Sequence, residues 1–169
     1  MVKVTARIDG VDEVLKALKA VDPELRKELP KEIKAYLNPI VDEMRSTIPG
    51  DRPLSGWKET GRIGWRSSTV RSSIRSKFRA SRKRGAKSRE FSLASISQSS
   101  PAGAIFDMAG RKSSGNTPQG RAMIAALNTR HGGASRTLWP TLERNRNRLE
   151  DGIRAILERY ADKVNRKLR

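Results

Sequence analysis

The stretch that decides the fold is residues 23–48, PELRKELPKEIKAYLNPIVDEMRSTI. Its apolar residues recur every three or four positions, and charged residues fill the positions between them, which is the pattern of one long amphipathic helix. The apolar stripe consists of Leu25, Leu29, Ile33, Leu37, Ile40, Met44 and Ile48. Asp22-Pro23 is a typical helix start, with an N-cap side chain followed by proline at the first helical position.

Two prolines fall inside this pattern. Pro30 and Pro39 each remove a backbone donor and crowd the preceding turn, so we expect a break at the first and a kink at the second. The segment Pro49-Gly50-Asp51-Arg52-Pro53 then ends the helix and opens a loop. The pattern therefore predicts a helix that is interrupted but keeps one apolar face.

The spacing of the apolar residues differs in the segment before this helix. Apolar and polar residues alternate over residues 2–7, which predicts a short half-buried strand that ends at Ile8-Asp9-Gly10. From Val11 to Val21 the apolar residues return to helical spacing, so a first helix is expected over roughly residues 11–20.

The centre of the chain predicts a basic β-hairpin at about residues 66–98. Apolar and cationic residues alternate along its first strand, which would give that strand one apolar and one cationic face. The apolar set is Val70, Ile74, Phe78 and Ala80, and the cationic set is Arg71, Arg75, Lys77 and Arg79. Phe91, Leu93 and Ile96 suggest the returning strand, and residues 81–88 are polar enough to form the tip.

The C-terminal third is mostly helical in pattern. Residues 100–110 fit either a strand or a short helix, and a flexible loop is expected at about residues 110–117. Thr117-Pro118 begins a helix that His131-Gly132-Gly133 ends. Apolar spacing from Thr137 to Arg169 predicts one helix of roughly 30 residues.

Together these elements predict a single α+β domain over residues 1–169. A small antiparallel sheet with a long basic β-hairpin would pack against N-terminal helices and a long C-terminal helix. The chain has 169 residues, of which 36% are hydrophobic and 32% charged, so the core is expected to be small. It contains no cysteine, and neither a signal peptide nor a membrane-spanning run is apparent, so we expect synthesis in a cytosol and no membrane contact.

The charge of the chain indicates an anionic partner. Its net charge is +18, and no acidic residue interrupts the sequence from Arg62 to Arg89. A run of one sign repels itself unless an anionic surface faces it, and both DNA phosphates and acidic protein neighbours meet that requirement. The predicted contact residues are Arg71, Arg75, Lys77, Arg79, Arg82, Lys83, Arg84, Lys87 and Arg89. The sequence shows no base-reading motif, so any DNA contact is expected to be to the backbone.

The residues give little support to catalysis. The one histidine, His131, lies beside two glycines at the expected end of a helix, where it has no companions for a metal site. The glycines match neither a P-loop nor a dinucleotide fingerprint, and the carboxylates are dispersed among basic residues. We therefore expect a protein that is not an enzyme and that uses no cofactor or metal.

The order of several short motifs resembles the neck, tail-completion or head-tail joining proteins of long-tailed bacteriophages. The matching segments are Ile-Asp-Gly-Val-Asp-Glu-Val-Leu-Lys-Ala-Leu at 8–18, Met-Arg-Ser-Thr-Ile-Pro at 44–49, Thr-Gly-Arg-Ile at 60–63, Ala-Ile-Phe-Asp-Met-Ala-Gly at 104–110 and Leu-Trp-Pro-Thr-Leu at 138–142. The fourth segment departs from the family pattern, because the usual aromatic residue before glycine is missing.

This resemblance implies a structural virion protein at the head-tail junction, assembled in the bacterial host cytoplasm. It implies a homo-oligomeric ring of roughly six or twelve subunits that contacts connector and tail-tube proteins and surrounds the passing genome. The expected assembly contacts are Ile105, Phe106, Met108 and Trp139. The alternative from another class is a nonspecific nucleic-acid-binding protein that acts through the basic hairpin.

Overall fold

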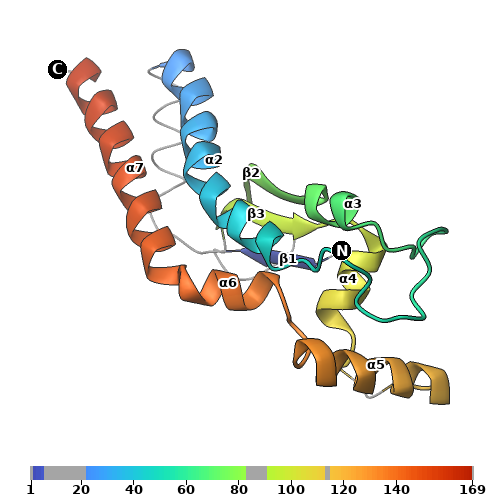
Figure 1. Ribbon diagram of the computed structural model, residues 1–169. Coiled ribbons are helices and arrows are strands. Elements are labelled where there is room, and N and C mark those ends of the chain that lie inside the picture. Colours follow the sequence, from blue (N-terminus) through green and yellow to red (C-terminus); the bar gives the residue numbers. More distant parts are fainter. Residues whose placement is uncertain (1, 6–21, 83–90, 113–114, 169) are drawn as a thin grey trace. The chain divides into compact units, whose positions relative to one another are not determined.

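The protein has an α+β fold in the part of the chain that a computed structural model describes, which is residues 2–5, 22–82, 91–112 and 115–168 (Figure 1). This confirms the predicted fold class. The elements in chain order are β1 (Val2–Thr5), α2 (Pro23–Ser46), α3 (Ser67–Ser72), β2 (Ile74–Arg82), β3 (Phe91–Gln98), α4 (Pro101–Met108), α5 (Pro118–His131), α6 (Leu138–Arg144) and α7 (Arg146–Leu168). The helix expected over residues 11–20 lies outside the described residues.

The three strands form one sheet in the order β1-β3-β2. Strands β2 and β3 are antiparallel neighbours, as the alternating pattern predicts, and the expected hairpin tip lies outside the described residues. The start of the hairpin was wrong, because Val70 belongs to helix α3 and the strand begins at Ile74. The amide of Val70 donates to the carbonyl of Arg66 at 2.9 Å, and the side chain of Val70 is buried, so packing places this residue in a helix.

Helix α2 runs without interruption from Pro23 to Ser46, with both Pro30 and Pro39 inside it. The expected break at Pro30 was therefore wrong. Proline in a helix interior costs roughly 3 kcal/mol. Leu29, directly before Pro30, and Ile33, three residues after it, are fully buried, and their packing outweighs the lost hydrogen bond. The predicted start is confirmed, since the Asp22 carboxylate accepts from the amides of Glu24 at 2.9 Å and Leu25 at 3.1 Å.

The predicted single C-terminal helix is two helices. Helix α6 ends at Arg144 and helix α7 begins at Arg146, with a turn at Asn145 between them. The carbonyl of Asn145 accepts from the amide of Leu149 at 2.8 Å, so Asn145 starts a new helix instead of continuing the old one. Residues 101–108 form a short helix, which settles the choice between strand and helix for that segment.

The chain divides into two compact units that interleave in sequence. Unit 1 consists of Met1–Val4, Ile40–Arg75 and Ser97–Arg144, and unit 2 of Thr5–Pro39, Ser76–Ile96 and Asn145–Arg169. The chain passes from one unit to the other within β1, α2, β2 and β3 and between α6 and α7. The expectation of a single domain stays a prediction.

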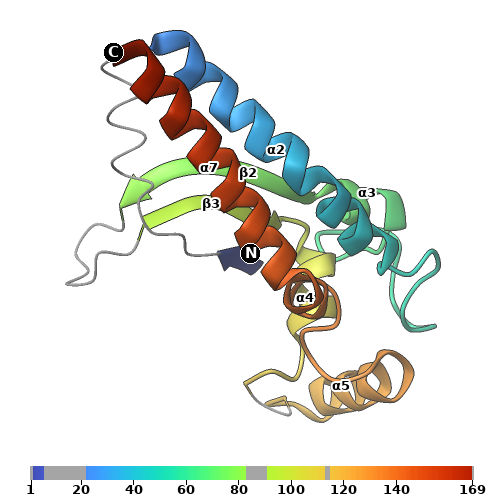
Figure 2. The same ribbon diagram turned by 90° about the vertical axis from the view of Figure 1, so that its left-hand side faces the viewer.

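Unit 2 is built on a helix pair, in which residues 23–39 of α2 lie side by side with α7 (Figures 1 and 2). The two helices are antiparallel, because Lys167 bonds to Asp22 at one end and Tyr36 donates to the carbonyl of Arg148 at 2.5 Å towards the other. Gly152 of α7 lies directly against the ring of Tyr36 and leaves room for it. The buried seam contains Leu25, Leu29, Ile33, Leu37, Leu149, Ile153, Ile156, Leu157, Tyr160 and Val164.

The core of unit 1 contains a row of rings in edge-to-face contact. Trp57 meets Trp65 with a centroid separation of 5.5 Å, Trp65 meets Phe106 at 5.3 Å, and Phe106 meets His131 at 5.2 Å. These rings come from the loop after α2, from α4 and from the last residue of α5. The row therefore fixes the long loop between α2 and α3 against two helices.

Candidate anion-binding site

The loop between α2 and α3, residues 47–66, carries the candidate site. Its path is fixed from within, because the indole of Trp57 donates to the carbonyl of Ile63 at 2.8 Å and the amide of Trp65 donates to the carbonyl of Lys58 at 2.8 Å. Arg71 of α3 donates to the carbonyl of Ile48 at 2.8 Å. The loop is thus held by its own indole rings and by the helix that follows it.

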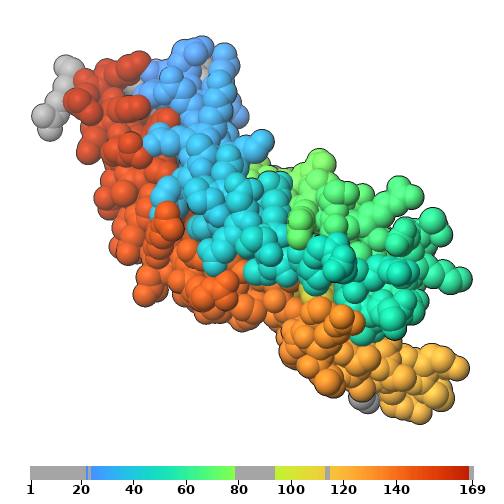
Figure 3. Space-filling view, in the orientation of Figure 1, coloured from blue at the N-terminus to red at the C-terminus, as the bar shows by residue number. Residues whose placement is uncertain are grey.

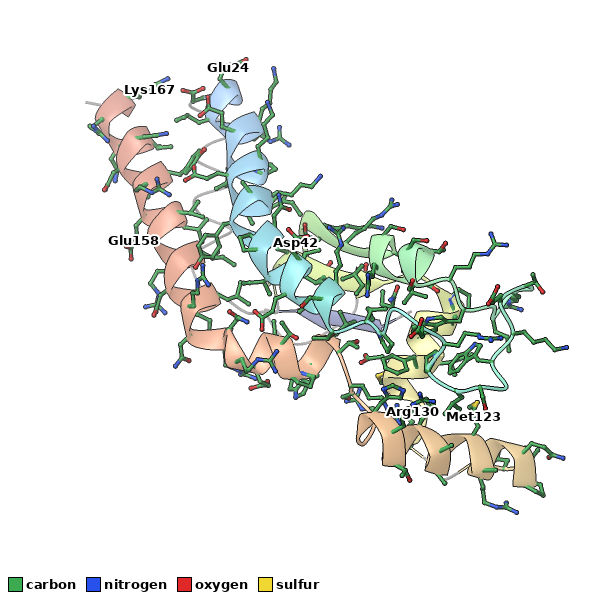
Figure 4. The ribbon with its side chains drawn as sticks, in the orientation of Figure 1. Glu24, Asp42, Met123, Arg130, Glu158 and Lys167 are labelled. Atoms are coloured by element: carbon green, nitrogen blue, oxygen red, sulfur yellow. The ribbon has the colours of Figure 1, made fainter. Side chains whose placement is uncertain are left out.

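Helix α5 brings a further cation to this loop. Nε2 of His131 donates to the carbonyl oxygen of Pro53 at 3.0 Å, which places the end of α5 against the loop. Arg130 directly precedes His131 and lies on the side of the helix that faces the loop (Figure 4). On the surface, the loop and the C-terminal end of α5 adjoin each other (Figure 3).

Two open surface pockets, called the hollows below, lie along these segments. The first has a volume of about 620 Å³ and is lined by Gly50, Asp51, Arg52, Ser55, Glu59, Trp65, Arg66, Ser67, Ser68 and Arg130. The second has a volume of about 470 Å³ and is lined by Glu59, Thr60, Gly61, Arg62, Gly64, Arg66, Thr69, Ser73, Ser99, Ser100 and Pro101. Arg66 and Glu59 belong to both linings, so the hollows adjoin each other.

The cations of these hollows are largely unpaired. Arg52 lies 3.8 Å from the carboxylate of Glu59, which is a long and exposed ion pair. The guanidinium groups of Arg62, Arg66 and Arg130 form neither an ion pair nor a hydrogen bond with any residue that the structure describes. Arg66 is also the N-cap residue of α3, where its side chain makes no capping bond. Three guanidinium groups are therefore available to an anion.

A network of hydrogen bonds around Arg136 and Asp107, called the brace below, holds α4, α5 and the start of α6 together. Arg136 donates to the carbonyls of Phe106 at 2.6 Å and Gly132 at 2.9 Å, and to the side-chain oxygen of Asn128 at 2.7 Å. Burial lowers the pKa of Arg136, and the nearby carboxylate of Asp107 acts in the opposite direction. This brace fixes the end of α5 and with it the position of the site.

Asp107 is the acidic member of the brace and is only 1% exposed. One of its carboxylate oxygens accepts from both the amide and the hydroxyl of Thr137, each at 2.7 Å. Its other oxygen is buried and has no hydrogen-bond partner in the described part of the protein. The backbone of Asp107 contributes as well, because its carbonyl accepts from the amide of Ser135 at 2.6 Å.

The structure separates the contact residues that the sequence predicts. Arg71 serves the fold, since it is half-buried and donates to the loop, and Arg75 donates to the carbonyl of Ser72 at 3.1 Å. Lys77 is exposed on β2. Arg79 and Arg82 also lie in β2, whereas Lys83, Arg84, Lys87 and Arg89 lie outside the described residues.

The predicted assembly residues also differ in their surroundings. Phe106 is 2% exposed and belongs to the ring row, so its side chain is part of the core and is not a contact surface. Ile105 and Met108 of α4 are half-buried. Trp139 is 48% exposed and Ile63 is 53% exposed, and these are the two large apolar side chains that the described surface exposes.

Sequence reasoning missed most of the hollow-forming residues. Arg62 and Arg66 fall in the acid-free run from Arg62 to Arg89, but they precede the predicted contacts, which begin at Arg71. Arg52 and Arg130 carry no local signal, because neither lies in a run of basic residues. The hydrogen bond between His131 and Pro53 and the row of rings, which joins the loop to α4 and α5, bring these residues to one place.

The described residues contain no group of three or more histidine, cysteine or acidic side chains that would hold a metal ion. Within the same residues, no helix has the length and apolar character needed to cross a bilayer. Comparisons with models of protein families, with curated proteins and with solved structures find no match for the chain.

Proposed function

We propose that this protein is a structural component of a long-tailed bacteriophage virion, where it forms a ring in the neck that joins or completes the tail. The proposal rests on the order of the five motifs that resemble neck and tail-completion proteins and on the α+β fold. Its neighbours would be connector and tail-tube proteins at the head-tail junction. The protein would assemble in the host cytoplasm.

One structural observation carries the proposal further. The two large apolar side chains on the described surface, Ile63 and Trp139, both belong to segments that carry the resemblance, Thr60–Ile63 and Leu138–Leu142. Aromatic and large apolar residues are typical of the buried centre of a protein interface. A ring needs two different surfaces on each subunit, because its interface joins unlike faces. Ile63 and Trp139 supply apolar contacts from two different segments of the chain.

The charge of the chain is compatible with the same role. Its surplus of lysine and arginine attracts acidic neighbours in an assembly, and it also attracts DNA. The second candidate function is therefore nonspecific nucleic-acid binding by a protein that acts alone. The observation that favours it is the set of unpaired guanidinium groups in unit 1.

Electron microscopy and light scattering of the purified full-length chain, at low and high salt, separate these functions. We expect rings that persist at high salt, because apolar contacts are not screened. Replacing Trp139 by serine is expected to dissociate the rings while the circular dichroism spectrum is retained. The matched control is Lys58→Ser, which changes another exposed residue of unit 1. Monomers at all salt concentrations that coat added DNA would establish the second function instead.

A further inference from the structure

We propose that the two adjoining hollows of unit 1 bind neighbouring phosphate groups of a nucleic-acid backbone. This site is distinct from the basic hairpin that the sequence predicts, and it goes beyond a role in joining head and tail. It consists of Arg62, Arg66 and Arg130 with the hydroxyl groups around them.

The hollows contain hydrogen-bond donors that suit a phosphate group. A phosphate group is bound by guanidinium forks and by hydroxyl groups, both of which donate to its oxygens. Ser55, Ser67 and Ser68 line the first hollow and Thr60 lines the second, and none of these hydroxyls has a partner among the described residues. Unpaired guanidinium groups and unpaired hydroxyls therefore converge on the same two hollows.

The two hollows lie next to each other and share one cation. Arg66 belongs to both linings, with Arg130 in the first hollow and Arg62 in the second. A nucleic-acid strand repeats its charge at every nucleotide, so a shared cation between two cationic hollows fits two phosphates in sequence. A single free phosphate would occupy one hollow only.

The site offers neither a free aromatic face nor an apolar pocket among its described residues. The aromatic rings beside the hollows, Trp57 and Trp65, are buried and packed on each other, so neither offers a free face for a base to stack on. Apart from buried Trp65 and from Pro101, the lining residues are polar, charged or glycine, so few apolar side chains are present to anchor those of a peptide. The site thus suits a phosphate backbone without reading its sequence.

Two carboxylates limit how tightly the site holds its ligand. Asp51 and Glu59 share the lining with the arginines, and Glu59 lies near Arg52. A nucleic-acid backbone that binds here is attracted by the arginines and repelled by the carboxylates. Its affinity is therefore moderate and falls as the salt concentration rises.

The test compares two double variants of equal charge in the full-length chain. The double variant Arg66→Ala with Arg130→Ala removes two arginine side chains from the hollows. Arg121→Ala with Arg154→Ala removes two exposed arginines elsewhere, one of them on the same helix as Arg130, and neither has a partner among the described residues. Binding of a labelled DNA duplex of random sequence is measured by fluorescence anisotropy across a range of salt concentrations.

We expect the hollow variant to lose affinity about tenfold more than the control and its salt slope to fall by about two, one for each phosphate contact removed. Equal losses in the two variants would overturn the proposal, since only net charge would then matter. The proposal would also fail if polyglutamate competed for the hollows as well as DNA does, or if Arg66 and Arg130 held inorganic phosphate but contributed nothing to DNA affinity.

This outcome is independent of ring formation. The hollow variant is expected to form the same rings as the unmodified chain, whereas Trp139→Ser is expected to lose rings and keep its two phosphate contacts. Loss of DNA binding with intact rings leaves the neck function standing, and loss of rings with intact binding leaves the phosphate site standing.

Discussion

The helix pair of unit 2 and the hollows of unit 1 are both rich in arginine and lysine, but two cations of the helix pair have acidic partners across the pair, whereas three arginines of the hollows have none in the part of the chain that the structure describes. In the helix pair, Arg159 is paired with Glu32 and Lys167 with Asp22. In the hollows, Arg62, Arg66 and Arg130 have no acidic partner among the described residues. Cations that form ion pairs within the protein contribute to the stability of the fold, whereas unpaired cations are available to bind a partner.

The two units also carry different spectroscopic probes, which makes the comparison measurable. All three tryptophans, Trp57, Trp65 and Trp139, belong to unit 1, and both tyrosines, Tyr36 and Tyr160, belong to unit 2. Tryptophan fluorescence therefore reports on the site and its supporting core, and the absorbance of tyrosine reports on the helix pair.

The largest expected effect comes from removing the acid that unit 1 buries. Asp107→Ala leaves the amide of Thr137 without its acceptor and Arg136 without a nearby anion, so it is expected to lower the free energy of unfolding by about 3 kcal/mol. Urea denaturation followed by tryptophan fluorescence measures this loss. Asp151→Ala, at an exposed position of α7, is the control and should change the free energy by less than about 0.5 kcal/mol. Equal effects would mean that the brace does not stabilise unit 1.

The next effect is in the helix pair. Alanine in place of a helical glycine normally stabilises by up to about 1 kcal/mol, but a β-carbon at Gly152 would collide with the ring and hydroxyl of Tyr36. Gly152→Ala is therefore expected to lower the free energy of unfolding by about 2 kcal/mol. The measurement is urea denaturation followed by helical circular dichroism. In a Tyr36→Ala background the same substitution should cost nothing, and a persistent cost there would contradict the close contact.

The third effect depends on pH. Burial, and a hydrogen bond to Glu32, raise the pKa of Tyr160 from its ordinary value of 10.0 to about 12. Because the folded pKa lies above the unfolded one, the contribution to stability is complete below pH 10 and is lost as the pH rises through 12.

Ultraviolet titration of the phenolate absorbance is expected to show one of the two tyrosines ionising late. Tyr160→Phe should remove this late step and flatten the loss of stability in the same range. A late step that persists in Tyr160→Phe would assign it to Tyr36 and contradict the burial argument.

The smallest effect separates the paired cations from the unpaired ones. Arg159→Ala removes an exposed ion pair with Glu32 and should cost about 0.5 kcal/mol. Arg130→Ala removes a guanidinium with no described partner, so it should leave the thermal unfolding temperature unchanged. Differential scanning calorimetry at low salt compares the two. A larger loss for Arg130→Ala would show that this residue serves the fold and not a ligand.

Much of the secondary structure could be predicted from local pattern. The long helix from Pro23, the strand at Val2–Thr5, the returning strand at Phe91–Gln98 and the helix with its Thr117 cap all follow from short-range periodicity and capping. The failures occurred where packing overrode that pattern. Val70 alternates with its cationic neighbours as a strand residue would, but it is buried in a helical turn. Pro30 should break a helix, but Leu29 and Ile33 on either side of it are fully buried.

The sequence by itself determined the helix and strand types and the uneven placement of charge, because both depend on residues that are close together along the chain. Only the tertiary structure decided which cations are paired. Arg159 pairs with Glu32 across the helix pair, whereas Arg130 lies at the loop beside Arg66 and forms no ion pair with a described residue. The physical reason is that an ion pair depends on distance in space, and residues far apart in sequence acquire that distance only when the chain has folded.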